Sequence, residues 1–425
     1  MGTIDTISII FTTYLLIVVF SYYVLLILKE RKPPHHKKHQ TISIIIPAHN
    51  EERYIESSIN SVVNAKFDGV KQIIVADDGS SDKTYEIISN YDKSKLNEGD
   101  TLLILKTKHT GKSATLNSAL EKATGSMVAI VDGDSVIDRN ALMEISDEMS
   151  RKNVSAVSCV VKVKNRKNFF GMWFHIEQIY VSLIRSILSK VNANITTPGP
   201  LSVYRRDDLM EVGGFSTEGF SEDADITIKL IRKGKKVIFS ERAISETNMP
   251  EDIKGILRQR TRFARGSINL LKRHLKVNNC LIDMYTLPLL FFNYVQSVIM
   301  GSITIYQLYS GYKLYFYSQG IIFNTKVFLF FFEWFSMYGF AKWTYQVFVG
   351  IAPLNLLSAV AIISSLLSYP LYFYAVYKFD KKFDLRHLIP LVFMFPFWFA
   401  NMIIYILCVP EIFMKQQYNR WKKNE

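Results

Sequence analysis

The sequence predicts an α/β domain with a mostly parallel sheet, joined to a helical domain that crosses a membrane. Short runs rich in β-branched residues alternate with helical patterns between residues 42 and 163, as is typical of a parallel sheet covered by helices. Long apolar segments precede and follow this region. The 425 residues are 49% hydrophobic and 13% aromatic, which is rich for a purely soluble protein.

The predicted strands are short apolar stretches. They are residues 42–46, 73–76, 102–105, 127–131 and 154–163. Between them, apolar residues recur at helical spacing, as at Ile55, Ile59 and Val62 and again at Leu116 and Leu120. In open sheets of this kind, ligands bind beyond the carboxyl ends of the strands, so polar residues at those ends are the first candidates for a site.

An apolar and uncharged segment, residues 7–28, is long enough to span the hydrocarbon core of a bilayer as a helix. The strongly basic residues 29–39 follow it, whereas a secretory signal peptide carries its charge before the apolar run and ends at a cleavage site. We therefore expect a retained anchor. The positive-inside rule then places the α/β domain in the cytoplasm, and three widely spaced cysteines also favour a reducing compartment.

Four further apolar segments predict later membrane spans. They are residues 286–309, 321–341, 353–377 and 388–409. Four such spans would return the basic tail, residues 415–423, to the cytoplasm. The second segment contains Glu333 and ends at Lys342, so an interfacial or re-entrant segment is the alternative, and it would put the C-terminus outside.

The expected organisation is a multi-pass protein of the cell membrane with four parts. They are an anchor with its basic segment (1–40), a cytoplasmic domain (41–250), an amphipathic interfacial helix (251–283) and a helical membrane domain (284–425). The net charge of +13 lies largely beside the apolar runs, where cytoplasmic positive charge and anionic lipid account for it. We therefore expect membrane lipids, and no nucleic acid, as partners.

Two predicted strands end in acidic clusters, Asp77 with Asp78 and Asp132 with Asp134. Each cluster also suits a tight turn, and the first suits a turn followed by a helix cap, so a purely structural role is the alternative. The second cluster follows a strand that is apolar throughout. Carboxylate oxygens in that position are suited to Mg²⁺ or Mn²⁺ bound together with substrate phosphates.

Seven short motifs, taken in order, carry a resemblance to a known family. They are residues 44–51, 77–82, 111–117, 132–134, 213–215, 221–225 and 259–263. In this order and spacing the chain resembles the family 2 glycosyltransferases, especially the membrane-embedded hyaluronan, chitin, cellulose and poly-N-acetylglucosamine synthases. The resemblance implies a Rossmann-like cytoplasmic domain of the glycosyltransferase-A type.

The resemblance also implies roles on the donor side of a site. Asp77 or Asp78 would contact the uracil and ribose of a UDP-sugar, and Asp132 would contact the donor. Asp134 would hold Mg²⁺ or Mn²⁺ bridging the diphosphate, and Lys112 would add positive charge near the phosphates. Displacing a nucleoside diphosphate needs such charge stabilisation on the leaving group, whatever the family.

On the acceptor side, the resemblance makes Asp223 the general base, next to Glu222 in the acceptor site. A hydroxyl is a poor nucleophile unless its proton is removed, and one base without an enzyme nucleophile implies direct displacement with inversion. The alternative is that these carboxylates only favour the first turn of a helix at residues 226–232.

The last motif places Gln259 and Arg262 on neighbouring points of one helix face. By resemblance, Arg262 engages the diphosphate, while Phe263 replaces the tryptophan that stacks near the acceptor sugar and keeps an apolar face without the indole donor. His109, before the Gly-Lys pair, departs from the family pattern with no assigned consequence. Apolar stripes within residues 169–187 and 253–271 predict either helices at the membrane surface or packing against the sheet.

Three functions follow as hypotheses. The first is a synthase that extends a β-linked polysaccharide from a UDP-hexose, plausibly UDP-N-acetylglucosamine, and exports it through its own helices. The second is an enzyme that adds one sugar to a membrane lipid. The third, from another class, is a noncatalytic membrane protein that binds a nucleotide sugar or transports a substrate, which Glu333 in an apolar segment would suit.

Overall fold

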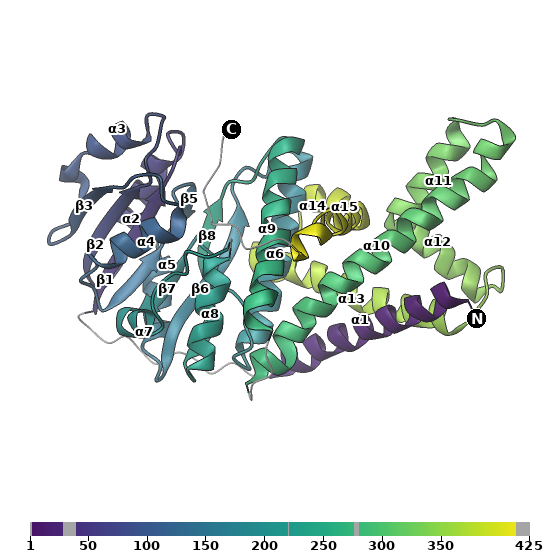
Figure 1. The fold of residues 1–425 in the computed structure, drawn as a ribbon, viewed down its shortest axis with the longest axis horizontal. Coiled ribbons are helices and arrows are strands. Elements are labelled where there is room, and N and C mark those ends of the chain that lie inside the picture. Colours follow the sequence, from purple (N-terminus) through teal and green to yellow (C-terminus); the bar gives the residue numbers. More distant parts are fainter. Residues whose placement is uncertain (1, 29–39, 220, 276–279, 414–425) are drawn as a thin grey trace.

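The structure, a computed structural model, describes residues 2–28, 40–219, 221–275 and 280–413. Eight strands form one sheet in the order β3-β2-β1-β4-β7-β6-β8-β5 (Figure 1). The strands are β1 (Gln40–Ala48), β2 (Gly69–Asp77), β3 (Thr101–Lys106), β4 (Met127–Ile130), β5 (Ser135–Ile137), β6 (Val154–Val163), β7 (Ser202–Arg205) and β8 (Lys236–Thr247).

The sheet is mixed but mostly parallel, as predicted. Strands β3, β2, β1 and β4 are parallel, β7 runs against both β4 and β6, β8 is parallel to β6, and β5 is antiparallel to β8. All five predicted strands are present, whereas β5, β7 and β8 were missed. Strands β5 and β7 are too short to show an alternating apolar pattern. In β8 the apolar pattern is interrupted by the charged residues Glu241 and Arg242, where its pairing with β6 shifts in register between Ser240 and Ile244.

Helices cover both faces of the sheet, because alternate side chains of the central strands are buried on opposite sides. Ile44 and Ile46 of β1 pack with α2 (Ile55–Asn64), α3 (Thr84–Ser89) and α5 (Ala141–Met149). Ile45, between them, packs on the other face with α4 (Lys112–Leu120), α7 (Arg206–Glu211) and α8 (Glu222–Arg232).

Two long helices, α6 (Phe169–Ser189) and α9 (Ile253–His274), lie between the sheet and the apolar helices (Figure 1). The stripe on α6 is buried against β6, β8 and the apolar helices, as the packing alternative predicts; the side chain of Phe169 lies outside the described residues. On α9 the C-terminal half is buried, whereas Ile253 and Leu257 are 66% and 50% exposed. These exposed apolar side chains keep the membrane-surface prediction for α9 open.

Among the residues that the structure describes, three helical segments are long and apolar enough to cross a membrane. They are α1 (Thr3–Ile27), the segment Ile282–Gln319 that contains α10 (Leu287–Tyr315), and α13 (Leu356–Asp380). A fourth arises if α14 (Leu385–Val392) and α15 (Met394–Leu407) form one span, although they meet at 49°. Pro396 explains the break, because in a continuous helix it would have no N–H to donate to the carbonyl of Val392 and its ring would clash with that carbonyl.

The prediction of a single span at residues 321–341 is wrong. The segment forms two short helices, α11 (Thr325–Phe335) and α12 (Met337–Phe348), with Ser336 between them in an extended conformation and capping α12. Lys342 donates to Glu333 across this turn at 2.5 Å. Helices of 11 and 12 residues are too short to cross a bilayer alone at roughly 1.5 Å per residue.

Short helical turns complete the chain: Lys93–Lys95, Ile282–Thr286, Tyr317–Gln319 and Val409–Ile412. The basic segments 29–39 and 415–423, on which the predicted sidedness depends, lie outside the described residues. The division into four parts therefore stays a prediction.

Candidate active site

The carboxyl ends of parallel strands β1, β2 and β4 meet at one edge of the sheet. Ala48 at the end of β1 is in register with Asp77 at the end of β2, and Asp132 follows β4 on the other side of β1. The acidic clusters predicted from sequence therefore lie at the same edge of the sheet, on either side of β1.

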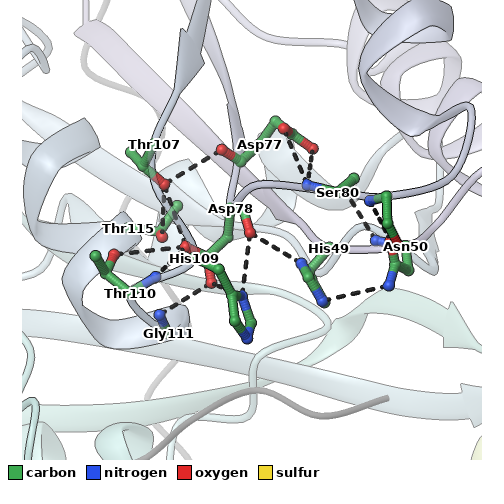
Figure 2. Close-up of polar contacts among 11 residues, drawn as sticks. His49, Asn50, Asp77, Asp78, Ser80, Thr107, His109, Thr110, Gly111 and Thr115 are labelled. Carbon is green, nitrogen blue, oxygen red and sulfur yellow. Dashed lines mark hydrogen bonds and ion pairs between the residues drawn. The ribbon is translucent and has the colours of Figure 1, made fainter. Parts of the chain in front are cut away.

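Asp78 fixes the loop that leads into α4 (Figure 2). Its carboxylate accepts hydrogen bonds from the backbone N–H of Thr110 at 2.8 Å and of Gly111 at 3.0 Å, and from the hydroxyl of Thr107 at 3.2 Å. Asp77 beside it accepts from the N–H of Ser80, and both side chains are fully buried. Asp78 thus holds the loop before Lys112, and a nucleotide contact by either carboxylate stays a prediction.

Two histidines that the sequence left without a role stack beside Asp78. The rings of His49 and His109 are 4.2 Å apart, and their Nδ1 atoms lie 2.9 and 3.2 Å from the Asp78 carbonyl oxygen. That oxygen can only accept, so both Nδ1 atoms donate. The side chains of the three residues bring potential metal ligands together, but protons on the facing nitrogens suit a hydrogen-bonded cluster better than a metal centre.

Lys112 joins both halves of the site. It is the first residue of α4, after Gly111 in a left-handed conformation, and its Nζ lies 2.7 Å from Asp132 and 3.2 Å from Glu222. Burial alone would lower the pKa of Lys112, but the two carboxylates outweigh it and raise the pKa, so the side chain stays charged. Gly199 packs so closely that a Cβ there would lie 2.5 Å from the Asp132 carboxylate.

Asp223, the predicted base, lies beside this group at the start of α8. Its carboxylate accepts from the Thr196 hydroxyl at 2.9 Å and from the N–H of Ala224 at 2.8 Å. Burial, and then the negative charge of Glu222, raise the pKa of Asp223. The structure therefore brings Asp132, Lys112, Glu222 and Asp223 together from positions up to 111 residues apart.

Asp225, two residues further along α8, has a different role. Its buried carboxylate accepts from His274 at 2.7 Å and pairs with Lys229 at 2.8 Å and Arg273 at 3.0 Å. Although burial acts to raise its pKa, these contacts lower it. Of the motif's acids, Glu222 and Asp223 face the site, while Asp225 ties α8 to the end of α9.

Asp134 lies one glycine beyond Asp132, where β8 ends. Its Oδ1 accepts from the Thr247 hydroxyl at 3.4 Å, and its carbonyl accepts from the Asn248 amide at 3.1 Å. Asp132 and Asp134 each supply carboxylate oxygens, the type of ligand that suits Mg²⁺ or Mn²⁺. The residues thus fit the cation that was predicted from sequence, and Asp134 as its ligand remains a prediction.

The residues of the motif on α9, 259–263, differ in burial, because some face solvent and others face the protein interior. Arg262 and Phe263 are exposed, with the guanidinium 5.7 Å from the Phe263 ring centre, and Gln259 is half-buried. Arg260, to which no role was assigned from sequence, is buried instead: it donates to Glu177 of α6 at 2.6 Å and stacks on Phe174. The roles of Arg260 and Glu177 could not be predicted from sequence, because they depend on the pairing of two helices that lie far apart in the chain.

Comparison with known proteins identifies the α/β region. Residues 43–213 match the family model described as Glycosyl transferase family 2. The chain carries a family 2 glycosyltransferase domain. Its relatives include the poly-beta-1,6-N-acetyl-D-glucosamine synthase of Staphylococcus epidermidis, 29% identical over 236 residues, or 55% of this chain and 56% of the relative. The Bacillus subtilis probable glycosyltransferase YdaM is 28% identical over 273 residues, or 61% of this chain and 64% of the relative.

The match to these relatives thus spans little more than half of their length. Among solved structures, mannosyltransferase PcManGT from Pyrobaculum calidifontis, in complex with GDP-Man and Mn²⁺, has a TM-score of 0.60 at 18% identity. The alignment covers 89% of this chain and all of that one. The domain therefore has the Rossmann-like glycosyltransferase-A fold that the resemblance implied, here with long apolar helices attached.

Proposed function

We propose that this chain is an inverting membrane glycosyltransferase that takes a sugar from a UDP-sugar and adds it to a glycan hydroxyl, extending a β-linked polysaccharide. The convergence of Asp132, Lys112, Glu222 and Asp223 carries the proposal. This arrangement places a positive charge, which can stabilise a leaving diphosphate, close to a carboxylate that can accept the proton of an incoming hydroxyl.

On the donor side, Lys112 and Asp132 bind the nucleoside diphosphate sugar, with Gln259 and Arg262 closing on the diphosphate. The relative is named for a product built from N-acetylglucosamine, which supports UDP-N-acetylglucosamine as the donor. Asp132 and Asp134 would hold Mg²⁺ or Mn²⁺, which neutralises charge on the leaving diphosphate when bound.

On the acceptor side, Asp223 accepts the proton of the attacking hydroxyl as the new glycosidic bond forms. Burial beside Glu222 raises the pKa of Asp223, which makes it a better proton acceptor than an exposed aspartate. The Thr196 hydroxyl fixes its orientation. Because no second carboxylate acts as a nucleophile, one displacement inverts the anomeric centre.

We place the catalytic domain in the cytoplasm, with α1, α10 and α13 crossing the membrane and α9 at its surface. Export of the glycan through these helices belongs to the same proposal. The transporter alternative loses its main support, because Glu333 is paired with Lys342 in the α11–α12 turn.

Transfer of one sugar to a lipid remains the second candidate, since Phe263 stands in place of the tryptophan of polymer synthases. Mass spectrometry of products formed by the purified full-length protein decides between them. A panel of UDP- and GDP-sugars would be offered with oligosaccharide or polyprenyl phosphate acceptors. A ladder of sugar increments supports the polymerase, one increment on lipid supports the second candidate, and no transfer from any donor refutes both.

A further inference from the structure

The three apolar segments proposed as spans are each joined to the α/β domain at one end. At the end of α1, Lys190 of α6 donates to the Leu28 carbonyl at 2.9 Å. Before α10, Thr286 donates at 2.8 Å to a backbone carbonyl that follows α6, and at the end of α13, Asp380 pairs with Lys162 of β6 at 2.9 Å. The segment between α10 and α13 therefore begins and ends away from the α/β domain, on what we call the far side (Figure 1).

The last two helices, α14 and α15, are joined to the α/β domain at both ends. The first begins where α13 ends, and the Nε2 atom of His387 lies 3.2 Å from the Asp380 carboxylate. Just after α15, Glu411 pairs with Arg265 of α9 at 2.7 Å, and its carbonyl accepts from Lys272 at 3.0 Å. A span has its two ends on opposite sides of the bilayer, so these contacts indicate that α14 and α15 enter and leave on the side of the α/β domain.

Between α10 and α13, the helices α11 and α12 form a hairpin with an apolar surface. Gly339 of α12 lies so close to α11 that a Cβ would be 1.8 Å from the Glu333 carbonyl oxygen, and Lys342 pairs with Glu333 across the turn. The large side chains that the hairpin exposes are Phe328, Leu329, Trp334, Tyr338, Tyr345 and Phe348. Contiguous apolar patches of this kind are rare on surfaces that face water, whereas lipid acyl chains remove them from water.

Contacts at the tip of the hairpin indicate how far it reaches. The ring of Phe335, the last residue of α11, lies 5.7 Å from that of Phe399 and 6.0 Å from that of Phe395, both in α15. The rings of Phe332 and Phe393 are 5.8 Å apart. The hairpin thus starts on the far side and touches helices that are held from the opposite side. It therefore extends into the bilayer rather than lying on its far surface.

We propose that the α11–α12 hairpin is a re-entrant segment that inserts among the lipid acyl chains of the far leaflet and meets a second re-entrant segment, α14–α15. The described part of the membrane domain then has three crossings, α1, α10 and α13, and Phe413 lies on the same side as the α/β domain. The basic composition of residues 415–423 favours that side too. This inference rests on the proposed placement of the three spans.

Cysteine labelling of the full-length protein tests the crossings. The background is C280S, because Cys159 and Cys408 are buried. Single cysteines replace exposed residues after α10, α13 and α15, in the variants S318C, K382C and F413C. A charged maleimide should label S318C on intact cells, whereas K382C and F413C should label roughly tenfold more after permeabilisation, because the charged reagent does not cross the bilayer.

Labelling of F413C on intact cells, as for S318C, would make α14–α15 a span and overturn the proposal. Labelling of S318C and K382C from the same side would contradict the proposed spans themselves. The two failures are therefore distinguishable, and neither measurement needs sugar transfer.

Nitroxide labels test the lipid contact of the hairpin. Y338C near its tip and F348C at the end of α12 replace side chains that are 57% and 78% exposed. In phosphatidylcholine vesicles, the ratio of relaxation by oxygen to relaxation by a polar nickel chelate should be roughly threefold or more higher at Y338C, because oxygen enters hydrocarbon and the chelate does not. W334C, also exposed near the tip, replaces Y338C if that variant does not fold.

Equal ratios at the two positions would indicate a hairpin on the membrane surface and overturn the proposal. Protection of both labels from both reagents, with dipolar broadening between labels on two chains, would mean that a second copy covers the hairpin instead of lipid, and would overturn it as well.

Discussion

The donor and acceptor sides of the site are built differently. On the proposed donor side, the charged groups find partners within the protein: the Asp78 carboxylate accepts four hydrogen bonds from the 107–111 loop, and Lys112 pairs with Asp132. On the proposed acceptor side, Phe263 is 43% exposed, and the Asp223 carboxylate is held by hydrogen bonds from Thr196 and from the N–H of Ala224. The charged groups proposed for the donor side are thus held in place by the protein itself.

The difference follows from the elements that build each side. Of the residues proposed for the donor side, Asp77, Asp78 and Asp132 lie at the ends of central strands, which are buried on both faces, whereas Gln259 and Arg262 lie on α9. Those proposed for the acceptor side lie on α8 and α9, and α9 is paired with α6, which is also tied to the apolar helices: His175 bonds Asp380 at the end of α13 at 2.6 Å, and Lys190 donates to carbonyls at the end of α1. A movement of the apolar helices would therefore reach α6 and α9 before the strand ends.

The largest effect should come from the base. D223N should lower kcat by about 10²–10⁴, the usual contribution of a general base, with UDP affinity unchanged. Titration calorimetry with UDP and initial rates check both parts. D207N, at an exposed acid of α7, is the matched control. Turnover at the wild-type rate would remove Asp223 from the mechanism.

The same variant gives a second, independent readout. Because burial raises the pKa of Asp223 in the folded state, its ionisation opposes folding above that pKa. The sign is therefore that D223N melts at a higher temperature than wild type at neutral pH. The difference should vanish once the pH falls below the pKa of the unfolded state, where both proteins are uncharged at this position. A lower melting temperature for D223N at neutral pH would contradict the burial argument.

The next effect tests what holds the acceptor side together. R260M should destabilise the protein by about 3–5 kcal/mol, because it leaves Glu177 as a buried unpaired charge. Thermal unfolding in detergent measures this, and R262M, two residues away and exposed, should change it little. The double variant R260M/E177M should lose less than the sum of the single changes. Equal effects of R260M and R262M would refute the assignment.

The sequence located the residues proposed for the donor side more readily than the residues that build the rest of the site. Asp77, Asp132 and Lys112 lie at strand ends or a helix start, so an apolar run followed by a polar turn locates them. Glu177 lies in a long amphipathic stretch whose pattern predicts burial but does not predict which polar residue meets another helix. The prediction of a span at residues 321–341 was wrong for a similar reason. The composition shows that the segment is apolar, but it does not show that Ser336 ends one helix and caps the next.

A smaller effect is expected where the donor loop is held. D78N should raise the donor KM by roughly tenfold to a hundredfold, because an amide nitrogen would face the N–H of Thr110 or Gly111 and loosen the loop before Lys112. The acceptor KM should stay within twofold. D82N, at an acid that accepts from Thr84 in the next turn, is the control. If both KM values rise together in D78N, the two sides are not independent.

The smallest effect should appear in the pH profile of E222Q. Burial and the negative charge of Glu222 both raise the pKa of Asp223, so removing that charge lowers it, and Lys112, freed from Glu222, acts in the same direction. The acidic limb of kcat/KM should therefore move to lower pH, so that E222Q keeps a larger share of its own maximal rate in acid than wild type does. E218Q, an exposed glutamate before α8, should leave the limb in place. If the acidic limb of E222Q moved to higher pH instead, Glu222 would act mainly by holding Lys112 in position. The proposed donor and acceptor sides would then be coupled through Lys112 rather than through Asp223.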